Sequence, residues 1–385
     1  MKKILVVAMA DSVHTARWIR QFDKDKIEFV LFPSTPHRRV HPLILQHMSQ
    51  RLTSTLKISK WMKLGALPIG IFDLIFNNYF RAKLLAKEIN SFRPDFIHVM
   101  ETQHSGYLTD KALANVKKRP KIILSIWGSD LFWFQKFSNH QTKIRSFLEK
   151  VDTLIVECKR DQSLAVKFGY KGKFLDAIPA TGGLETQRLK KLALISPPSQ
   201  RKQIAVKGYS GFVGLGREAL KLIEEIEDEI QGFSVIVYSA GFGTWWSSRR
   251  LRNSLGNRIV IARKNKLSNR EIEEMFLRSR IAIGLSMSDG LPATVKEAMC
   301  TGVFPVQTDT SCAGEWFKPK LGGFLVPPNK VSVAAAAVLL ALKDNQLVDN
   351  AMIQNLAIAE SRFSAVIVRE MARKTYLDEE NSSEK

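Results

Sequence analysis

The sequence predicts an α/β protein with two domains, each built around a parallel β-sheet. Short apolar runs alternate with helical segments along both halves of the chain, and a segment rich in proline and glycine separates the halves. Residues 281–307 read as strand, tight turn, helix and strand, which is the crossover that generates parallel pairing. With 385 residues, 45% of them hydrophobic, the chain is long enough for two ordinary cores.

The expected strands are short apolar runs bounded by turn residues, and both halves of the chain contain five of them. No repeat of the solenoid type accompanies this alternation. Each half is therefore expected to form an open parallel sheet. The first five expected strands cover residues 2–10, 27–32, 95–100, 121–126 and 152–157, and the second five cover 203–207, 234–238, 258–262, 281–285 and 304–307.

The domain boundaries follow from the turn residues. Residues 179–203 contain three prolines and two glycines and are the predicted linker. The linker joins a first domain over residues 1–178 to a second over 204–363. A helix over 364–377 is expected to cross back onto the first domain, and the acidic, polar tail 378–385 is expected to be disordered.

The net charge of +21 is distributed unevenly along the chain. Residues 1–195 contain 33 Lys/Arg and 16 Asp/Glu, a net charge of +17, whereas residues 196–385 contain 25 and 21, a net charge of +4. This asymmetry favours an anionic partner for the first domain: lipid headgroups, nucleic acid or an acidic glycan. A soluble protein of high pI with no such partner is the alternative, because charge alone names no partner.

The chain offers no paired cysteine spacing and no Cys/His cluster for a metal, so we expect a reducing cytoplasm and no metal site. Met1–Ala10 is read as a first buried strand and not as a signal peptide. Leu64–Phe76 is too short to span a bilayer and contains Pro68 and Asp73. It is either an interfacial helix, preceded by lysines and Trp61, or an ordinary core helix.

The stretch Ser286–Val306 carries the most specific chemistry. Asp289 and the following glycine and proline end a buried strand, Thr294 is a plausible N-cap, and Glu297 stands three residues later as a capping-box partner would. The start of a helix after a parallel strand attracts phosphate. Asp289 and Glu297 flank this turn, and carboxylates there accept hydrogen bonds from neutral hydroxyls. The arrangement predicts a diphosphate with sugar hydroxyls on both sides. Asp289 and Glu297 would hold the hydroxyls, and the diphosphate would lie at the turn residues Gly290, Leu291, Pro292, Ala293 and Thr294.

This stretch resembles the signature of the retaining GT-B glycosyltransferases, especially the large family four (glycosyl transferases group 1), in which seven residues separate an acidic residue from a glutamate. The resemblance implies two Rossmann-like domains that face each other across a cleft. It also implies that Asp289 meets hydroxyls of the donor sugar and that Glu297 holds the ribose. Aspartate in place of the commoner glutamate departs from the family pattern and shortens the reach by one methylene.

The family also places an arginine and a lysine on the donor diphosphate, and this chain lacks their usual motif. Lys207 and Arg217, on either side of a glycine-rich loop, are expected to converge on one phosphate site, although both also fit as surface cations. The base would be contacted from residues 263–267, where Lys264 is the candidate.

In the first domain, the resemblance points to loops that follow predicted strands. His14 follows the first strand, where it is a candidate for the donor phosphate or a helix cap. Glu101 and His104 resemble the His-containing loop beside the transferred sugar. Trp127-Gly-Ser-Asp130 resembles the family's His-Gly-Ser-Asp, which leaves Asp130 as a partner for an acceptor hydroxyl or as a helix N-cap.

The activity implied by the resemblance is retaining transfer of a sugar from a nucleoside diphosphate sugar to a hydroxyl of a glycan or lipid-linked acceptor. We expect this reaction in cell-surface polysaccharide or glycolipid synthesis, in the cytoplasm or on the inner face of the cytoplasmic membrane, with no cofactor, no metal and no specific nucleic acid. Two alternatives stay open: a GT-B nucleotide-sugar epimerase, and a basic nucleic-acid-binding protein without catalysis.

Overall fold

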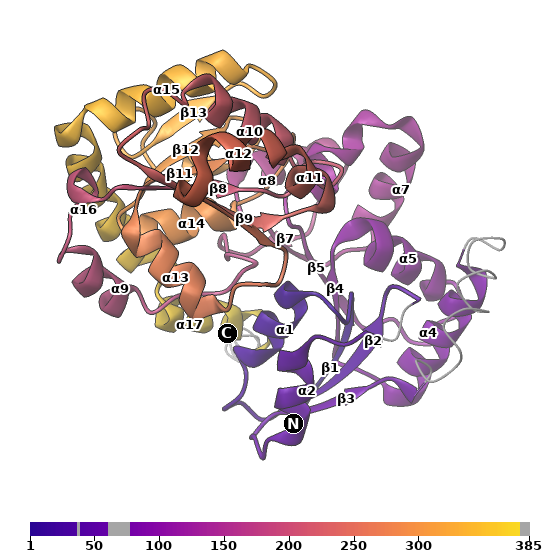
Figure 1. Ribbon diagram of the computed structural model, residues 1–385. Helices are drawn as coiled ribbons and strands as arrows, with labels where there is room; N and C mark the ends of the chain where they lie inside the picture. The colour runs from indigo at the N-terminus through magenta and orange to yellow at the C-terminus, as the bar shows by residue number, and fades with distance from the viewer. Residues whose placement is uncertain (37–38, 61–77, 378–385) are drawn as a thin grey trace. The chain divides into compact units, whose positions relative to one another are not determined.

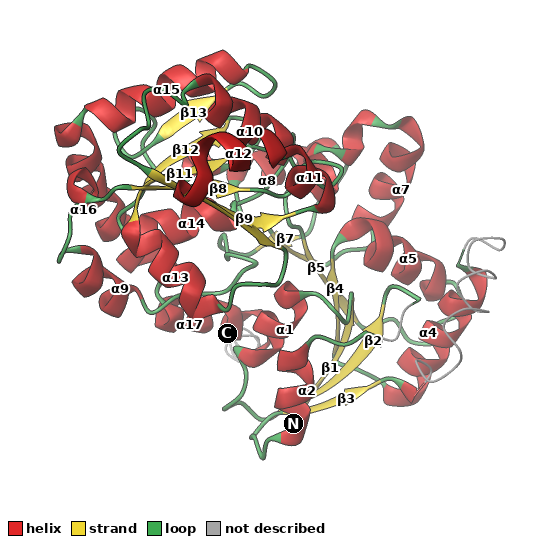
Figure 2. Cartoon of the chain, in the orientation of Figure 1, coloured by secondary structure: helices red, strands yellow, loops and turns green. Residues whose placement is uncertain are grey.

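The computed structural model describes residues 1–36, 39–60 and 78–377 (Figure 1). The chain divides into two compact units, the first formed by Met1–Gly182 with Val368–Lys385 and the second by Gly183–Ile367. Each unit contains a parallel sheet packed between helices (Figure 2). The predicted fold class of two parallel-sheet α/β domains is thereby confirmed.

The first unit is built on seven parallel strands. They are β1 (Lys2–Ala8), β2 (Ile27–Pro33), β3 (Thr55–Ile58), β4 (Phe96–Met100), β5 (Lys121–Ser125), β6 (Thr153–Ile155) and β7 (Lys173–Phe174). Their spatial order is β3-β2-β1-β4-β5-β6-β7. From β1 the strand order runs to β3 on one side and from β4 to β7 on the other, so it reverses between β1 and β4. Open sheets of this kind bind ligands at such a reversal, beyond the carboxyl ends of the strands.

Alternate residues of the strands face opposite sides of this sheet. Leu5 and Val7 of β1 belong to one apolar cluster, whereas Ile4 and Val6 belong to another. Helices α4, α5, α6, α7 and α8 pack on the first side, and α1, α2 and α17 pack on the second. Their bounds are α1 (Val13–Arg20), α2 (Pro42–Ser49), α4 (Tyr79–Phe92), α5 (Tyr107–Leu113), α6 (Ser129–Phe132), α7 (Ser138–Leu148), α8 (Lys159–Lys167) and α17 (Ala365–Leu377); the short helical turns are η2 (Thr102–Gly106) and η3 (Phe134–Lys136).

The last helix, α17, completes the core of the first unit (Figure 1). Tyr376 is fully buried, and its hydroxyl accepts a hydrogen bond from Trp18 Nε1 at 2.9 Å. The same hydroxyl meets the ring of His98, whose other nitrogen lies 2.7 Å from Ser125 Oγ. Burial lowers the pKa of His98 to about 3, so the ring is neutral in this network.

The second unit is built on six parallel strands. They are β8 (Gln203–Lys207), β9 (Ser234–Ala240), β10 (Ile259–Arg263), β11 (Ser279–Gly284), β12 (Phe304–Thr308) and β13 (Phe324–Val326). Their spatial order is β10-β9-β8-β11-β12-β13. The reversal here falls between β8 and β11, so the sheet has the strand order of a doubly wound nucleotide-binding fold.

Helices cover both faces of the second sheet. α10, α15 and α16 join the large apolar cluster on one face, and α13 and α14 join the cluster on the other. The helices are α9 (Thr186–Ala193), α10 (Gly216–Glu225), α11 (Phe242–Ser247), α12 (Arg249–Leu255), α13 (Asn269–Arg278), α14 (Ala293–Cys300), α15 (Val331–Lys343) and α16 (Asn345–Phe363), with short turns η4 (Pro198–Gln200), η5 (Gly256–Arg258) and η6 (Ala313–Glu315).

The segment that we predicted as a linker lies in the second unit from Gly183 onward. Leu184 exchanges backbone hydrogen bonds with Phe363 and Ala365, both at 2.8 Å. Arg201 is buried and donates to the carbonyl oxygens of Ala193 at 3.1 Å and Thr301 at 3.0 Å. These bonds fix residues 183–203 to the body of the unit.

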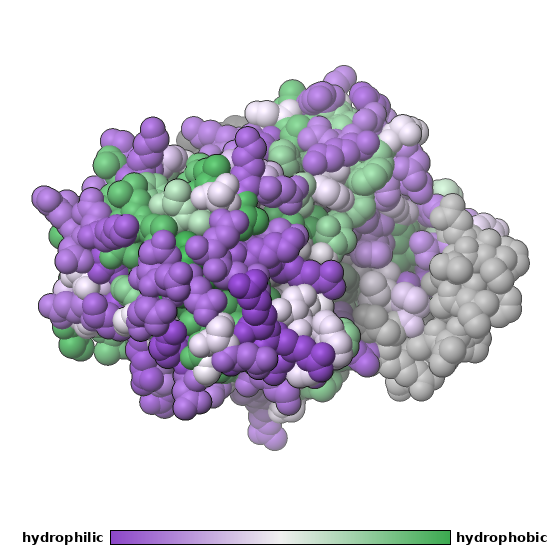
Figure 3. Space-filling view, turned by 45° about the horizontal axis from the view of Figure 1, so that its top comes forward, coloured by the Kyte–Doolittle hydropathy of each residue, from purple (hydrophilic) through white to green (hydrophobic). Residues whose placement is uncertain are grey.

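Apolar side chains appear among polar ones on the surface shown in Figure 3. In the part of the chain that the structure describes, no single helix is long and apolar enough to cross a bilayer. α15 and α16 meet such a criterion only as a pair bent by 92°, by length and composition alone. The interfacial or core helix predicted at Leu64–Phe76 and the disordered tail 378–385 lie outside the described residues.

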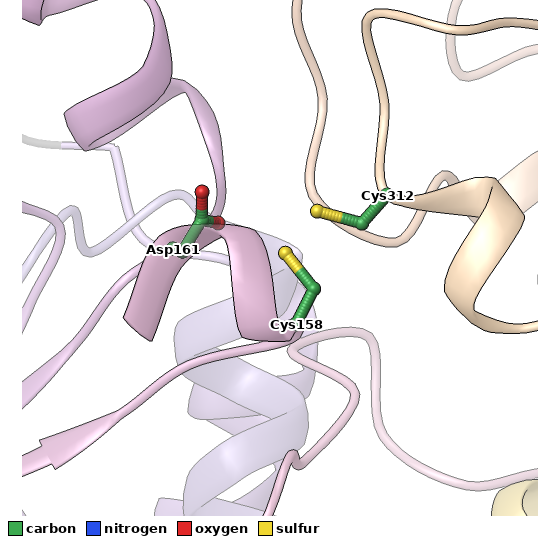
Figure 4. A group of neighbouring side chains, drawn as sticks. All are labelled: Cys158, Asp161 and Cys312. Carbon is green, nitrogen blue, oxygen red and sulfur yellow. The ribbon is translucent and has the colours of Figure 1, made fainter. Parts of the chain in front are cut away.

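Each of the three cysteines lies at one end of a helix or helical turn. Cys158 is the N-terminal boundary residue of α8, and Asp161 lies in the first turn of this helix (Figure 4). Cys312, in the second unit, immediately precedes η6 (Figure 4). Cys300 ends α14 as a buried free thiol, and burial raises its pKa to about 12.

Candidate functional site

In the second unit, the loops that follow β8 and β11 are joined to each other at the point where the strand order reverses. Leu215 N–H donates to Leu285 O at 3.1 Å, and Met287 N–H donates to Val213 O at 2.7 Å. The end of β12 joins them, because Thr308 Oγ1 accepts from Ser286 N at 3.0 Å. Three strand ends therefore converge on one edge of the sheet.

Lys207 and Asp289 meet at this edge. Lys207 is the last residue of β8, and its Nζ lies 3.6 Å from Asp289 Oδ2. The other carboxylate oxygen of Asp289 accepts a hydrogen bond from Gly290 N at 3.0 Å. The two side chains are 22% and 29% exposed, so both remain accessible to a ligand. The site combines a cation suited to phosphate with a carboxylate suited to hydroxyls.

The glycines of the loop after β8 are required by close backbone contact. A Cβ on Gly216, the first residue of α10, would lie 2.7 Å from the carbonyl carbon and oxygen of Gly208. A Cβ on Gly208 would lie 2.9 Å from Ala240 Cα. The loop therefore folds back on itself and on the end of β9, which brings the backbone of α10 close to the edge of the sheet.

Arg217 is the second residue of α10. Its guanidinium packs on Gly243 of α11, where a Cβ would lie 2.5 Å from Nη2, and the side chain is exposed. Lys207 Nζ lies 3.6 Å from Asp289 Oδ2. The expected convergence of both cations on one phosphate stays a prediction.

Thr294 does not cap α14, and our capping-box prediction was wrong. The helix begins at Ala293, and Pro292, with φ −62° and ψ 131°, stands at its boundary without a side-chain cap. Because proline fixes the entry into the helix, Thr294 already lies inside the first turn. It is 1% exposed, and its hydroxyl lies 2.6 Å from the hydroxyl of Tyr238 on β9.

Glu297 lies one turn further along α14 and is half-buried. Burial and then the charge of Glu297 raise the pKa of Tyr238, which places the carboxylate near the buried end of β9. At the start of the helix, Leu291 is buried and Gly290 O accepts from Cys312 N at 2.9 Å. The turn between Asp289 and Glu297 is thus held by contacts on both of its sides.

Lys264 lies just after β10. Its backbone N–H donates to Ala240 O at 3.1 Å, and its side chain is exposed. The next residue, Asn265, has a φ of +63° and makes the turn toward α13. The hydrogen bond joins this loop to the end of β9. In the sheet, β9 lies on one side of β8, and β11, the strand that precedes Asp289, lies on the other.

In the first unit, Glu101 follows β4 with a φ of +80°. Its buried carboxylate accepts backbone hydrogen bonds from Gln103, from His104 at 2.9 Å and from Ser105 at 3.3 Å. These hydrogen bonds lower the pKa of Glu101, but burial raises it by more, so the pKa is about 7. His104 belongs to the same turn and its side chain is exposed.

Asp130 is a second buried carboxyl at this edge. One of its oxygens accepts from Trp127 N at 3.2 Å, and its backbone oxygen accepts from Gln103 Nε2 at 2.9 Å. Burial, and then the charge of Glu101, raise its pKa well above the usual value. The alternative of Asp130 as an N-cap is not what the structure shows, because Gly128 stands at the boundary of α6 without a side-chain cap.

His14 stacks on Trp127, with ring centroids 4.8 Å apart. Its Nδ1 lies 3.3 Å from Ala180 O. Ser12, not His14, caps α1, and its hydroxyl accepts the His14 N–H at 3.2 Å. The structure therefore joins His14 with Trp127, and Glu101 with Asp130, at the carboxyl edge of the first sheet.

Sequence reasoning missed Tyr238, which fixes the first turn of α14 through Thr294. A tyrosine near the end of an apolar run reads as core, and nothing in its own segment indicates the helix that it meets. It also missed His98 and Tyr376, which come together only across 278 positions of sequence.

Two family models match the chain. The glycosyl transferase 4-like model matches residues 3–158, in the first unit, and the glycosyl transferases group 1 model matches residues 247–357, in the second. Together they cover more than half of the chain. The chain belongs to the GT-B glycosyltransferases.

Solved structures of other glycosyltransferases share this fold over almost the whole chain. Anabaena HepE in complex with UDP and glucose has a TM-score of 0.67 and 15% identity, over 97% of this chain and 99% of that one. Sucrose-phosphate synthase from Thermosynechococcus elongatus has a TM-score of 0.71 and 12% identity, over 98% of both chains. Trehalose 6-phosphate synthase from Burkholderia multivorans has a TM-score of 0.68 and 13% identity, over 97% and 99%. A search of curated protein sequences finds no match.

Proposed function

We propose that this glycosyltransferase moves a sugar from a nucleoside diphosphate sugar to a hydroxyl of a glycan or lipid-linked acceptor, with retention of configuration at the anomeric carbon. The observation that carries the proposal is the contact between Lys207 and Asp289 where the strand order of the second unit reverses. The structures of HepE with UDP and with UDP-glucose support a nucleotide-sugar donor.

In this proposal the second unit holds the donor. Lys207 would contact the diphosphate, while Asp289 accepts hydrogen bonds from the donor sugar and Glu297 from the ribose. The backbone at the start of α14 adds N–H groups and the positive end of the helix dipole. Arg217, in the first turn of α10, would contribute to the diphosphate, and Lys264, in the loop after β10, would contribute to the base.

The proposed reaction is a substitution at the anomeric carbon of the donor sugar. The acceptor oxygen forms a bond to the anomeric carbon while the bond from this carbon to the diphosphate oxygen breaks, and the bonding pair leaves with the diphosphate. The acceptor oxygen attacks from the face of the sugar that the diphosphate leaves, so the configuration is retained, and its proton passes to an oxygen of the leaving phosphate. Lys207 stabilises the negative charge that develops on the leaving group.

The first unit would supply the acceptor side. Glu101, His104, Trp127 and Asp130 follow neighbouring strands β4 and β5, and the two carboxyls share one buried region. A carboxyl that keeps its proton near pH 7 can donate a hydrogen bond to an acceptor, whereas an ionised one can only accept.

The donor is tested by thermal stabilisation of the purified protein with UDP, GDP, ADP and CMP conjugates of sugars. A specific site predicts a shift with one nucleoside diphosphate family and its loss in Glu297→Ala. Removing a charged partner of a ligand hydroxyl costs about 1.5–3 kcal/mol, roughly a ten- to hundredfold loss of affinity. Glu229→Ala, at an exposed position of the same unit, is the matched control. Equal shifts with every nucleotide would contradict the donor site.

Retention and the epimerase alternative are separated by product analysis. The preferred donor is incubated with and without acceptor sugars, and the anomeric configuration of any glycoside is read by NMR. Retaining transfer predicts a product of the donor's anomeric configuration that forms only with acceptor. Isomerised donor formed without acceptor would favour the epimerase.

The charge of the first half supports a cellular location for the reaction. Residues 1–195 carry +17, and each basic residue near an anionic leaflet contributes about 1 kcal/mol of attraction. We therefore place the enzyme in the cytoplasm, on the inner face of the membrane, where a lipid-linked acceptor would be reached.

A further inference from the structure

A basic cavity opens at the amino ends of β4 and β5, the edge of the first sheet opposite to Glu101 and Asp130. It has a volume of about 640 Å³, within the range of about 300–1,000 Å³ that small-molecule sites occupy. The end of α4 forms one wall, and the segment that leads into β5 forms the other. The lining residues are Ile89, Asn90, Arg93, Pro94, Asp95, Lys117, Lys118, Arg119, Pro120 and Lys121.

The charge of this lining is strongly one-sided. Five of the ten residues are Lys or Arg, and Asp95 is the one acidic residue among the ten. The Asp95 carboxylate already accepts a hydrogen bond from Lys3 N at 2.8 Å. Arg119 is paired with Asp152 at 2.9 Å, an ion pair with both side chains partly exposed. A large positive excess therefore remains around the cavity.

The side chain of Asn90 joins the two walls through hydrogen bonds to backbone atoms, so no basic side chain is needed to hold them together. Asn90 Nδ2 donates to Asn115 O at 3.0 Å, and Asn90 Oδ1 accepts from Lys117 N at 3.0 Å. Arg93 adopts a left-handed conformation with a φ of +50° and closes α4 through a bond from its N–H to Ile89 O. The two walls of the cavity are thus held by the Asn90 side chain and by the backbone turn at Arg93.

Crowding of like charges at a rigid rim opposes folding unless counter-charge is supplied. We propose that this cavity binds a phosphate-rich anion, either the headgroup of an anionic phospholipid or a soluble compound with a diphosphate. Lysines supply point charges and arginines a bidentate fork, the two ways in which proteins hold phosphate oxygens. The inference is independent of the proposed transfer reaction, because its residues belong to the opposite edge of the sheet.

The test combines ligand binding with the stability of the free protein. The double variant Lys117→Gln, Lys118→Gln is compared with the unmodified chain, both in a Lys207→Ala background that removes the proposed phosphate contact of the second unit. Inorganic pyrophosphate is titrated by calorimetry. Separately, vesicles of phosphatidylglycerol or phosphatidylcholine are sedimented with the protein. Lys24→Gln is the control, because this exposed lysine stands between Asp23 and Asp25.

We expect the double variant to lose affinity for pyrophosphate, for phosphatidylglycerol vesicles or for both, by at least tenfold, and to unfold at a higher temperature than its parent when no anion is present. Lys24→Gln should keep the affinity and gain no thermal stability. Loss with pyrophosphate alone identifies a soluble ligand, and loss with vesicles alone identifies a headgroup. Binding of neither anion by the parent, or unchanged binding by the double variant, would overturn the proposal.

Discussion

At the scale of single residues, Glu101 and Asp130 show how surroundings decide what a carboxyl group can do. Both are buried at the ends of neighbouring strands, and burial raises the pKa of each. Three backbone N–H groups favour the ionised form of Glu101, yet burial outweighs them. The consequence is a dependence of stability on pH that an exposed glutamate would not cause.

Glu101→Gln tests this dependence. The folded protein holds the Glu101 proton up to about pH 7, whereas an unfolded chain releases it near pH 4.3. Between these values the folded state binds more protons, so its stability falls as pH rises. The stability of the unmodified chain relative to Glu101→Gln should fall by on the order of 2 kcal/mol from pH 5 to pH 7.5. Thermal unfolding at both pH values measures it.

Glu149→Gln, at an exposed position of the same unit, is the matched control. Its difference from the unmodified chain should stay constant over the same pH range. If the Glu101→Gln difference were equally constant, or moved in the opposite direction, the protonated state of Glu101 would be refuted.

At the scale of elements, two helices show that one sequence pattern has two structural outcomes. Ser268 and Glu271 form a reciprocal capping box at the start of α13. Thr294 and Glu297 have the same spacing, but Pro292 starts α14 earlier and turns Thr294 toward Tyr238. The pattern predicts the presence of the helix, whereas a partner distant in sequence decides the role of the threonine.

A double-mutant cycle tests the contact between α14 and β9. Thr294→Val and Tyr238→Phe should each destabilise the second unit by about 1–3 kcal/mol, because each leaves a buried hydroxyl without its partner. The double variant should cost less than the sum, with a coupling of about 0.5–2 kcal/mol. Denaturant unfolding measures all four proteins. Strict additivity would show that the two hydroxyls do not stabilise each other.

The interior strands could be predicted from the sequence because they are continuous apolar runs. β3 and β7 were missed: they have only four and two residues, lie at the edges of the first sheet, and are largely exposed. In the site, Asp289 and Glu297 were found as candidates from local spacing alone. The contact between Lys207 and Asp289 was not, because it depends on β8 and β11 being neighbours, which no local pattern reveals.

At the scale of the whole molecule, the first unit contains the two ends of the described chain, and the second unit is continuous. The first unit depends on α17 for part of its core, where Tyr376 packs beside Trp18, Phe22 and Phe29. A defect in α17 should therefore be felt in the first unit and not in the second.

Tyr376→Ala tests this separation. Truncating a buried aromatic side chain costs about 3–5 kcal/mol, so amide hydrogen exchange should accelerate in β1 and β4 while β8 and β11 keep their protection. Tyr376→Phe, which retains the ring and loses the bond to Trp18, should show a smaller change in the same strands. Equal acceleration in both units would contradict independent cores.

The return of α17 to the first unit also imposes an order of events during translation. Tyr376 is synthesised after every residue of the second unit, so the first unit cannot complete its core until synthesis has passed the end of the second unit. Until then, Trp18 and Phe22 lack the Tyr376 ring that they contact in the folded protein. The core of the first unit is therefore completed only by residues that follow the whole of the second unit in the sequence.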